Sequence, residues 1–171
     1  YFENMFSTHI RENDNQKIGF VSINTAWWAV GDNDDNNLLF PLSKIDEALD
    51  KIINCDIKIL IHHHPLSDFK PFNKYDLEDL LHNRFDYIFS GHIHKKALTL
   101  DLTHNEGVVK IGSSASLTFD NSSQIGYSII DINEEELKVT SSFRFYDINN
   151  ECFYSIEDKQ FDIPTTQVKI E

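Results

Sequence analysis

Two short histidine clusters are the most informative feature of this 171-residue sequence: Ile61-His62-His63-His64-Pro65 and Ser90-Gly91-His92-Ile93-His94. Together they contain five of the eight histidines. Each cluster directly follows a short apolar run that is typical of a buried strand. Neutral imidazole is a common protein ligand for zinc, iron and manganese-type metals. The two clusters therefore predict a metal site, provided that they meet in space.

The elements around the clusters indicate why they should meet. We predict a strand at residues 57–61, a helix at about 75–83 and a second strand at 85–89. A strand–helix–strand unit of this length makes its two strands parallel, so their carboxyl ends share one edge of a sheet. Both clusters begin at those ends, which is where open α/β sheets bind their ligands.

Spacing within the clusters restricts which imidazoles can share a site. His92 and His94 are two residues apart, so they point the same way in an extended segment. The first cluster leaves two alternatives. Either His63 is the ligand and its neighbours turn away, or His62 and His64 are ligands and His63 is not.

The other histidines and the acidic string offer weaker candidates. We interpret the isolated histidines as packed or surface residues; they are His9, His82 and His104. Residues 31–37 are rich in turn formers, and we interpret them as a solvated turn. The less favoured alternative is that Asp32 or Asp35 binds a metal.

The rest of the chain predicts one helix followed by a strand-rich second half. Ser43 is the expected N-cap of the helix, with Asp46 completing a variant of the capping box. The apolar positions of this helix fall on one face: Ile45, Ala48, Leu49, Ile52 and Ile53. We predict further strands at 19–25, 97–102, 108–112, 124–132 and 137–146, the last two as a hairpin. Residues 67–74 are expected to be a loop.

Length, charge and cysteines bound the class of protein. We expect one domain over residues 1–148 and an extension over 149–171 with one short strand. The net charge of −13 opposes direct nucleic-acid binding, although a metal-bridged phosphate ligand is compatible with it. No apolar run approaches the roughly 18 residues of a membrane span. Cys55 and Cys152 could form one disulfide, but we interpret them as free thiols, which favours a cytoplasmic location.

These residues resemble a known family. An apolar strand ending in His63-His64-Pro65, followed by one ending in Gly91-His92-Ile93-His94, resembles the C-terminal motifs of calcineurin-like metallophosphoesterases. Residues 21–26 and 107–116 are similar to further strands of that family. The resemblance covers about residues 19–146 and implies a two-sheet β-sandwich flanked by helices, in the α+β class.

The resemblance also implies ligands. His63 and His92 would bind one metal ion and His94 a second, the ions being divalent or trivalent Mn, Fe, Zn or Co. The family's Asp-x-His, Gly-Asp and Asn-His motifs do not occur before His62 in a matching context. We therefore expect the chain to be the C-terminal half of such a domain, with the N-terminal half on the same or another chain. No catalytic residue is assigned.

The implied activity is hydrolysis of phosphomonoesters or phosphodiesters by metal-activated water. The fragment alone is expected to be inactive, and the alternative function is a non-catalytic interaction or regulatory module. The loop at 67–74 offers Lys70 and Lys74 to a phosphate and two aromatics to a base, which would suit a nucleotide or nucleic-acid ester. The interpretation we favour is that Phe69 and Phe72 pack this loop down.

Overall fold

The computed structural model describes residues 5–12, 16–31, 34–92, 98–101, 108–112, 125–133, 135, 138–155 and 159–162. The chain divides into two compact units, residues 1–92 and residues 93–171, and each is described by itself. The fold is mixed α and β, as predicted. Among the described residues, no helix has the length and apolar character that crossing a membrane requires.

The described elements of the first unit are four strands of one sheet, two α-helices and two short 3-10 helices. Its elements are β1 (Phe6–Glu12), β2 (Lys17–Ile23), the 3-10 helix η1 (Ala26–Trp28), α1 (Leu42–Lys51), β3 (Ile57–His62), the 3-10 helix η2 (Leu66–Asp68), α2 (Pro71–Arg84) and β4 (Tyr87–Ser90). The strands lie in the order β1-β2-β3-β4. β1 is antiparallel to β2, whereas β2, β3 and β4 are parallel. The predicted parallel pair that precedes the two histidine clusters is therefore confirmed.

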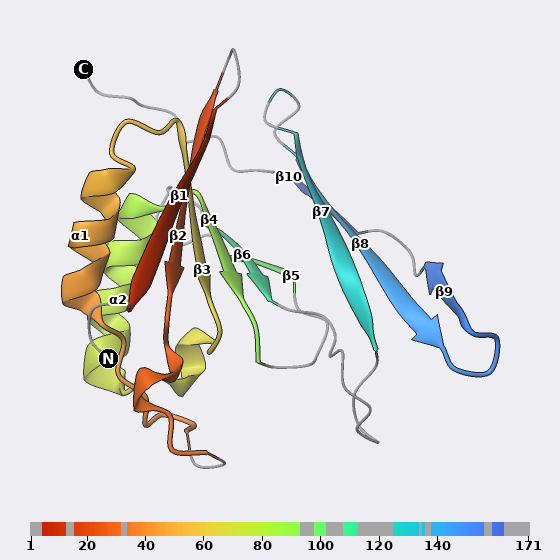
Figure 1. Ribbon diagram of the computed structural model, residues 1–171, viewed down its shortest axis with the longest axis horizontal. Coiled ribbons are helices and arrows are strands. Elements are labelled where there is room, and N and C mark those ends of the chain that lie inside the picture. Colours follow the sequence, from red (N-terminus) through yellow and green to blue (C-terminus); the bar gives the residue numbers. More distant parts are fainter. Residues whose placement is uncertain are drawn as a thin grey trace. The chain divides into compact units, whose positions relative to one another are not determined.

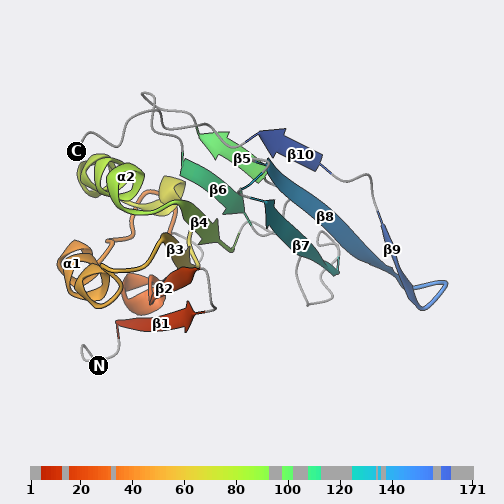
Figure 2. The ribbon, with the colours of Figure 1, turned by 90° about the horizontal axis from the view of Figure 1, so that it is seen from above.

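Both helices of the first unit cover the same face of its sheet (Figures 1 and 2). α1 buries Ile45, Ala48 and Leu49, and Ile52 directly after it is also fully buried. A Cβ at Gly19 of β2 would lie 2.7 Å from the Cβ of Ile52, so a larger residue there would push the end of α1 off the sheet. This close packing holds β2 and β3 in place, and with them the residues at their carboxyl ends.

Several predicted boundaries were wrong for local reasons. The N-cap of α1 is Pro41 and has no side-chain hydrogen bond, so Ser43 is not the cap and lies inside the helix. Ile53 lies beyond the end of α1 and is 64% exposed. α2 begins at Pro71, so residues 67–74 are not one loop, because the fixed φ of proline suits the first position of a helix.

Strand β1 had no prediction. Most of its residues are exposed or half-buried, so its sequence carries no clear alternation of apolar and polar positions. β1 is a strand because its backbone pairs with β2 over seven residues, from Phe6 opposite Ile23 to Glu12 opposite Lys17. This pairing cannot be seen in the sequence of β1 alone.

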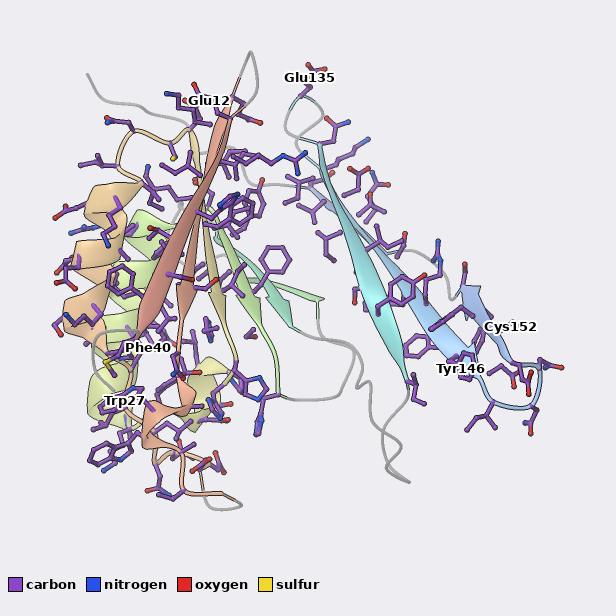
Figure 3. The ribbon with its side chains drawn as sticks, viewed as in Figure 1. Glu12, Trp27, Phe40, Glu135, Tyr146 and Cys152 are labelled. Atoms are coloured by element: carbon purple, nitrogen blue, oxygen red, sulfur yellow. The ribbon has the colours of Figure 1, made fainter. Side chains whose placement is uncertain are left out.

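The described elements of the second unit are strands. They are β5 (Leu98–Asp101), β6 (Val108–Gly112), β7 (Gly126–Asn133), β8 (Lys138–Asp147), β9 (Cys152–Ser155) and β10 (Lys159–Asp162). β5 pairs with β6, and β7 pairs with β8 as the predicted hairpin. β9 and β10 both pair with β8, so the tail contains two short strands instead of one. Figure 3 labels Tyr146 and Cys152, which lie at the β8–β9 end of this sheet.

One face of the sheet formed by β7–β10 is mainly apolar, with Ser141 of β8 also buried on it. Val139, Phe143 and Phe145 of β8 are buried at alternate positions, as the period of a strand requires. The domain boundary after residue 148, the sandwich arrangement of the sheets and the absent N-terminal half stay predictions.

Candidate metal centre

The two histidine clusters meet at one edge of the first unit's sheet. His62, the last residue of β3, lies opposite Ser90, the last residue of β4. The backbone N–H of Gly91 donates to the carbonyl oxygens of His62 at 3.2 Å and His63 at 2.9 Å. The chain segments that carry the imidazoles are thus tied together directly after the strands end.

Three imidazoles converge there. Nδ1 of His92 lies 3.2 Å from Nε2 of His63. The ring of His64 lies 4.8 Å from that of His63 and 4.9 Å from that of His92, measured between centroids. One nitrogen from each ring lies within 4.8 Å of the other two. We call His63, His64 and His92 the three-histidine centre.

Both alternatives for the first cluster assumed the alternation of an extended strand, and which of these histidines bind a metal stays a prediction. His63 and His64 both reach the centre although they are adjacent, whereas His62 does not belong to it. The reason is that β3 ends at His62 and residues 63–64 form a bend, so the two-residue alternation of a strand no longer applies.

His62 is a structural residue. Its side chain is buried, with its ring edge-on to Phe40 at 5.9 Å (Phe40 is labelled in Figure 3). Its Nδ1 donates to the carbonyl oxygen of His64 at 2.8 Å. Burial lowers the pKa of His62 to about 4, against the opposing effect of this hydrogen bond. The folded protein therefore holds His62 as a neutral ring that braces the bend.

This burial predicts a pH dependence of stability. Above pH 6.5 His62 is neutral in both the folded and the unfolded chain. Between pH 6.5 and about pH 4, His62 is protonated in the unfolded chain but stays neutral in the folded chain. The free energy of unfolding should therefore fall as the pH falls through this window, by up to about 3 kcal/mol at 1.36 kcal/mol per pKa unit. Urea unfolding of the metal-free chain at about pH 7 and about pH 5 measures the loss.

The matched variant for this prediction is His62→Leu, which removes the titrating group. It should be less stable at neutral pH because its partner carbonyl is left unpaired, but its stability should change less between the two pH values. Equal pH dependence in both proteins would contradict the assignment to His62.

His64 is a buried ring with a defined orientation. Nδ1 lies 2.9 Å from Oγ1 of Thr25, and that same oxygen accepts the backbone N–H of His64 at 3.2 Å. Burial lowers the pKa of His64, and His63 and His92 lower it further, while Asp68 and Asp34 act in the opposite direction. A neutral ring is the form that can bind a metal.

His63 and His92 are exposed and are placed by the backbone. His92 has a φ of 72°, a left-handed conformation that few residues other than glycine adopt. A Cβ on Gly91 would lie 3.2 Å from Nδ1 of His63, so the glycine leaves room for that ring. Such strained positions concentrate at functional sites.

Two acids lie near the centre. Oδ2 of Asp68 lies 4.0 Å from Nε2 of His92, and Oδ1 accepts the hydroxyl of Ser67 at 3.1 Å. Asp34 is buried and accepts the backbone N–H of Val30 at 2.8 Å. Asp35 is exposed in a turn, as predicted for this segment, and Asp32 lies outside the described residues.

The remaining histidines and the aromatic and basic residues of 67–74 either are not part of the three-histidine centre or lie outside the described residues. His94 and His104 lie outside the described residues, and so does the side chain of His82. His9 is exposed on β1, in agreement with its interpretation as a surface residue. Phe69 is fully buried against Phe40, so it packs the chain down as favoured and is not available to a substrate. The side chains of Phe72 and Lys74 are not described.

Thr25 and Asp34 were missed in the sequence, and His64 was left open. A signal for Thr25 existed, because it follows β2, which is parallel to β3 and ends beside it, with Ile23 opposite His62. The same reasoning that joined the histidine clusters would have placed Thr25 at this edge.

The donor set fits a transition metal. Imidazole nitrogens suit Zn, Cu, Fe and Ni, whereas Mg and Ca prefer oxygen ligands. Two nitrogens bound to one tetrahedral zinc lie roughly 3.4 Å apart, given bond lengths of about 2.0–2.1 Å. The 3.2 Å between Nδ1 of His92 and Nε2 of His63 is close to this spacing. The three-histidine centre can therefore hold a metal ion.

Comparison with known proteins gives distant likenesses. No family model matches the sequence, and no curated protein matches it. A novel phosphatase from Mycoplasma pneumoniae is 16% identical, with a TM-score of 0.47, and the match covers 92% of this chain and 58% of that one. A hypothetical protein from Thermus thermophilus is 12% identical, with a TM-score of 0.48 and coverage of 92% and 62%.

A third solved structure is a predicted phosphoesterase from Streptococcus pneumoniae. It is 12% identical, with a TM-score of 0.33, and the match covers 84% of this chain and 96% of that one. Two of these three proteins are described as a phosphatase and a phosphoesterase. The chain spans about three fifths of the length of the first two.

Proposed function

We propose that this chain supplies the histidine ligands of a metal-dependent phosphoesterase that hydrolyses phosphomonoesters or phosphodiesters. In this proposal His63 and His92 bind one metal ion. His94, outside the described residues, binds a second, and the ions are Mn, Fe, Zn or Co. The substrate is a phosphate ester, with nucleotides and nucleic acids among the candidates.

The observation that carries the proposal is the 3.2 Å approach of Nε2 of His63 to Nδ1 of His92. These residues come from separate strands, 29 positions apart in the sequence. The separation suits a hydrogen bond between the two rings, and it is also close to the spacing of two nitrogens on one tetrahedral metal ion.

The residues of the chain have definable tasks in such a site. β3 and β4 hold the two ligands on a packed sheet, so that little reorganisation is needed when a metal binds. The carboxylate of Asp68 lies on the outer side of His92, where it favours a proton on Nε2 and leaves Nδ1 free to bind. A bound metal would lower the pKa of a water molecule and neutralise charge on the phosphate oxygens.

The test uses the longest natural polypeptide that contains residues 1–171. Bound metal is measured by elemental analysis, and hydrolysis of bis-p-nitrophenyl phosphate is followed with and without added Mn²⁺. We expect metal-stimulated hydrolysis that His92→Ala removes and His9→Ala, an exposed histidine on β1, retains. Hydrolysis that survives His92→Ala at the wild-type rate contradicts the proposal.

The same experiment addresses the alternative function. A non-catalytic interaction module with a metallophosphoesterase-like fold would bind the metal through His63 and His92 but would not hydrolyse the ester under any metal condition. That combination of results would replace the enzymatic proposal.

A further inference from the structure

Thr25 is a buried polar side chain that contacts two atoms of His64. It is completely inaccessible to solvent. Its Oγ1 lies 2.9 Å from Nδ1 of His64 and accepts the backbone N–H of the same residue at 3.2 Å. Thr25 follows β2, and His64 follows β3, so the contact joins two neighbouring strand ends. Both the ring and the main chain of His64 are thereby fixed by one hydroxyl.

This contact determines which nitrogen of His64 is available. Because Nδ1 is engaged by Thr25, Nε2 is the ring nitrogen left to face another group. The ring of His64 lies 4.8 Å from that of His63 and 4.9 Å from that of His92. The nitrogens that the three residues offer lie within 4.8 Å of one another, so a small inward movement would bring all three onto one ion.

The protons of the ring are compatible with the same assignment. A neutral imidazole carries one N–H, and the nitrogen that binds a metal must be the bare one. If Nε2 binds, Nδ1 carries the proton and needs an acceptor. Oγ1 of Thr25 has two lone pairs and can accept both the backbone N–H and Nδ1–H of His64. The hydroxyl thus satisfies the tautomer that metal binding requires.

His92 repeats this arrangement. Its Nδ1 faces His63 at 3.2 Å, and its other nitrogen, Nε2, faces Oδ2 of Asp68 at 4.0 Å. In each ring an oxygen lies near one nitrogen, at 2.9 Å in His64 and at 4.0 Å in His92, and the other nitrogen is left for the centre. Metal-binding histidines are held in this way by an acceptor on the outer nitrogen.

We propose that His64 is a third metal ligand through Nε2, and that Thr25 is the positioning residue that sets its ring and its proton. The proposal rests on the proposed metal site and adds to it a ligand and a hydrogen-bond partner in the first unit. It gives the site three imidazoles from the described residues, a number that suits one tetrahedral ion with a remaining open position.

The first test follows the ring protons of wild-type protein labelled with ¹⁵N-histidine. Zinc is added to the metal-free chain, and ¹⁵N–¹H spectra locate the proton of each imidazole. We expect His64 in the zinc-loaded protein to carry its proton on Nδ1 and to show a metal-shifted Nε2. A proton on Nε2 of His64 in the zinc-loaded protein overturns the proposal.

The second test compares two variants of Thr25. Thr25→Val removes the hydroxyl and should weaken zinc binding by about 10- to 100-fold, as the loss of a partner to a metal-binding histidine does. Thr25→Ser keeps the hydroxyl and should bind zinc nearly as the wild type does. The affinities are measured by competition with a chromogenic chelator. Equal affinities of the two variants overturn the role of the hydroxyl.

The control is Ile23→Val, which trims a buried apolar side chain on the adjoining strand β2 and should leave the zinc affinity unchanged. A loss of affinity in Ile23→Val as large as that in Thr25→Val would mean that altered packing alone explains the effect, and would overturn the proposal. If Thr25→Val does not fold, Thr25→Ser and the ring spectra decide. If the wild-type protein binds no zinc, the proposed metal site itself is wrong. If the wild type binds zinc and Thr25→Val binds it with the same affinity, only the role of Thr25 is wrong.

Discussion

Replacing both His63 and His92 by alanine is expected to weaken zinc binding by more than about 100-fold. The two rings approach within 3.2 Å at the ends of separate strands. Losing an outer partner of a metal-binding histidine alone costs about 10- to 100-fold, so losing two ligands should cost more. Zinc affinity of the purified chain, measured by chelator competition, tests this directly.

The control for the double variant is His9→Ala, which removes an exposed histidine from β1. Both His63 and His92 are exposed, so the double variant should unfold at nearly the same urea concentration as the wild type. A folded double variant with wild-type zinc affinity would show that these residues are not ligands.

The second large effect is expected in the core beneath the centre. Phe69→Ala should lower the free energy of unfolding by about 3–5 kcal/mol, because the ring is fully buried and its removal leaves a cavity. The ring packs against Phe40 at 5.2 Å, and the Phe69 segment bridges to Leu38. A domain of this size has a total stability of about 5–15 kcal/mol, so the variant should be markedly destabilised. Urea unfolding monitored by circular dichroism measures the change.

Phe69→Leu is the matched variant, since it keeps most of the apolar volume and should cost much less. If Phe69 instead served a substrate, Phe69→Ala would leave the unfolding free energy close to that of the wild type. The zinc affinity of the folded fraction reports whether the Asp68 segment, which precedes Phe69, keeps its place near His92.

Much of the first unit follows from sequence patterns. The runs before the two clusters have the length and composition of buried strands, and the segment between them is long enough for a crossover helix. A parallel pair with both clusters at one edge follows from this order, and the register of Ile61 opposite Phe89 confirms it. Strand β1 was not predicted, because its sequence has no clear apolar alternation. The start of α2 at Pro71 was also missed, because a proline can either interrupt a helix or occupy its first position.

The identity of the histidines at the centre is a different matter. Sequence spacing treated residues 62–64 as an extended strand, in which neighbours point apart. The strand ends at His62, and the bend that follows turns His63 and His64 to the same side while His62 enters the core beside Phe40. A strand ends where its backbone stops pairing with the neighbouring strands. The residues of the cluster alone therefore do not show where β3 ends.

The sequence by itself therefore determined that two sets of imidazoles meet at one edge of a sheet, because strand order and the parallel crossover fix where the strand ends lie. Only the tertiary structure decided which of them converge. The contacts of Thr25 with His64, of Gly91 with His63 and of Asp68 with His92 join residues that are distant in the chain. Such contacts set the orientation and the proton of each ring, and those two properties decide whether a histidine can bind a metal.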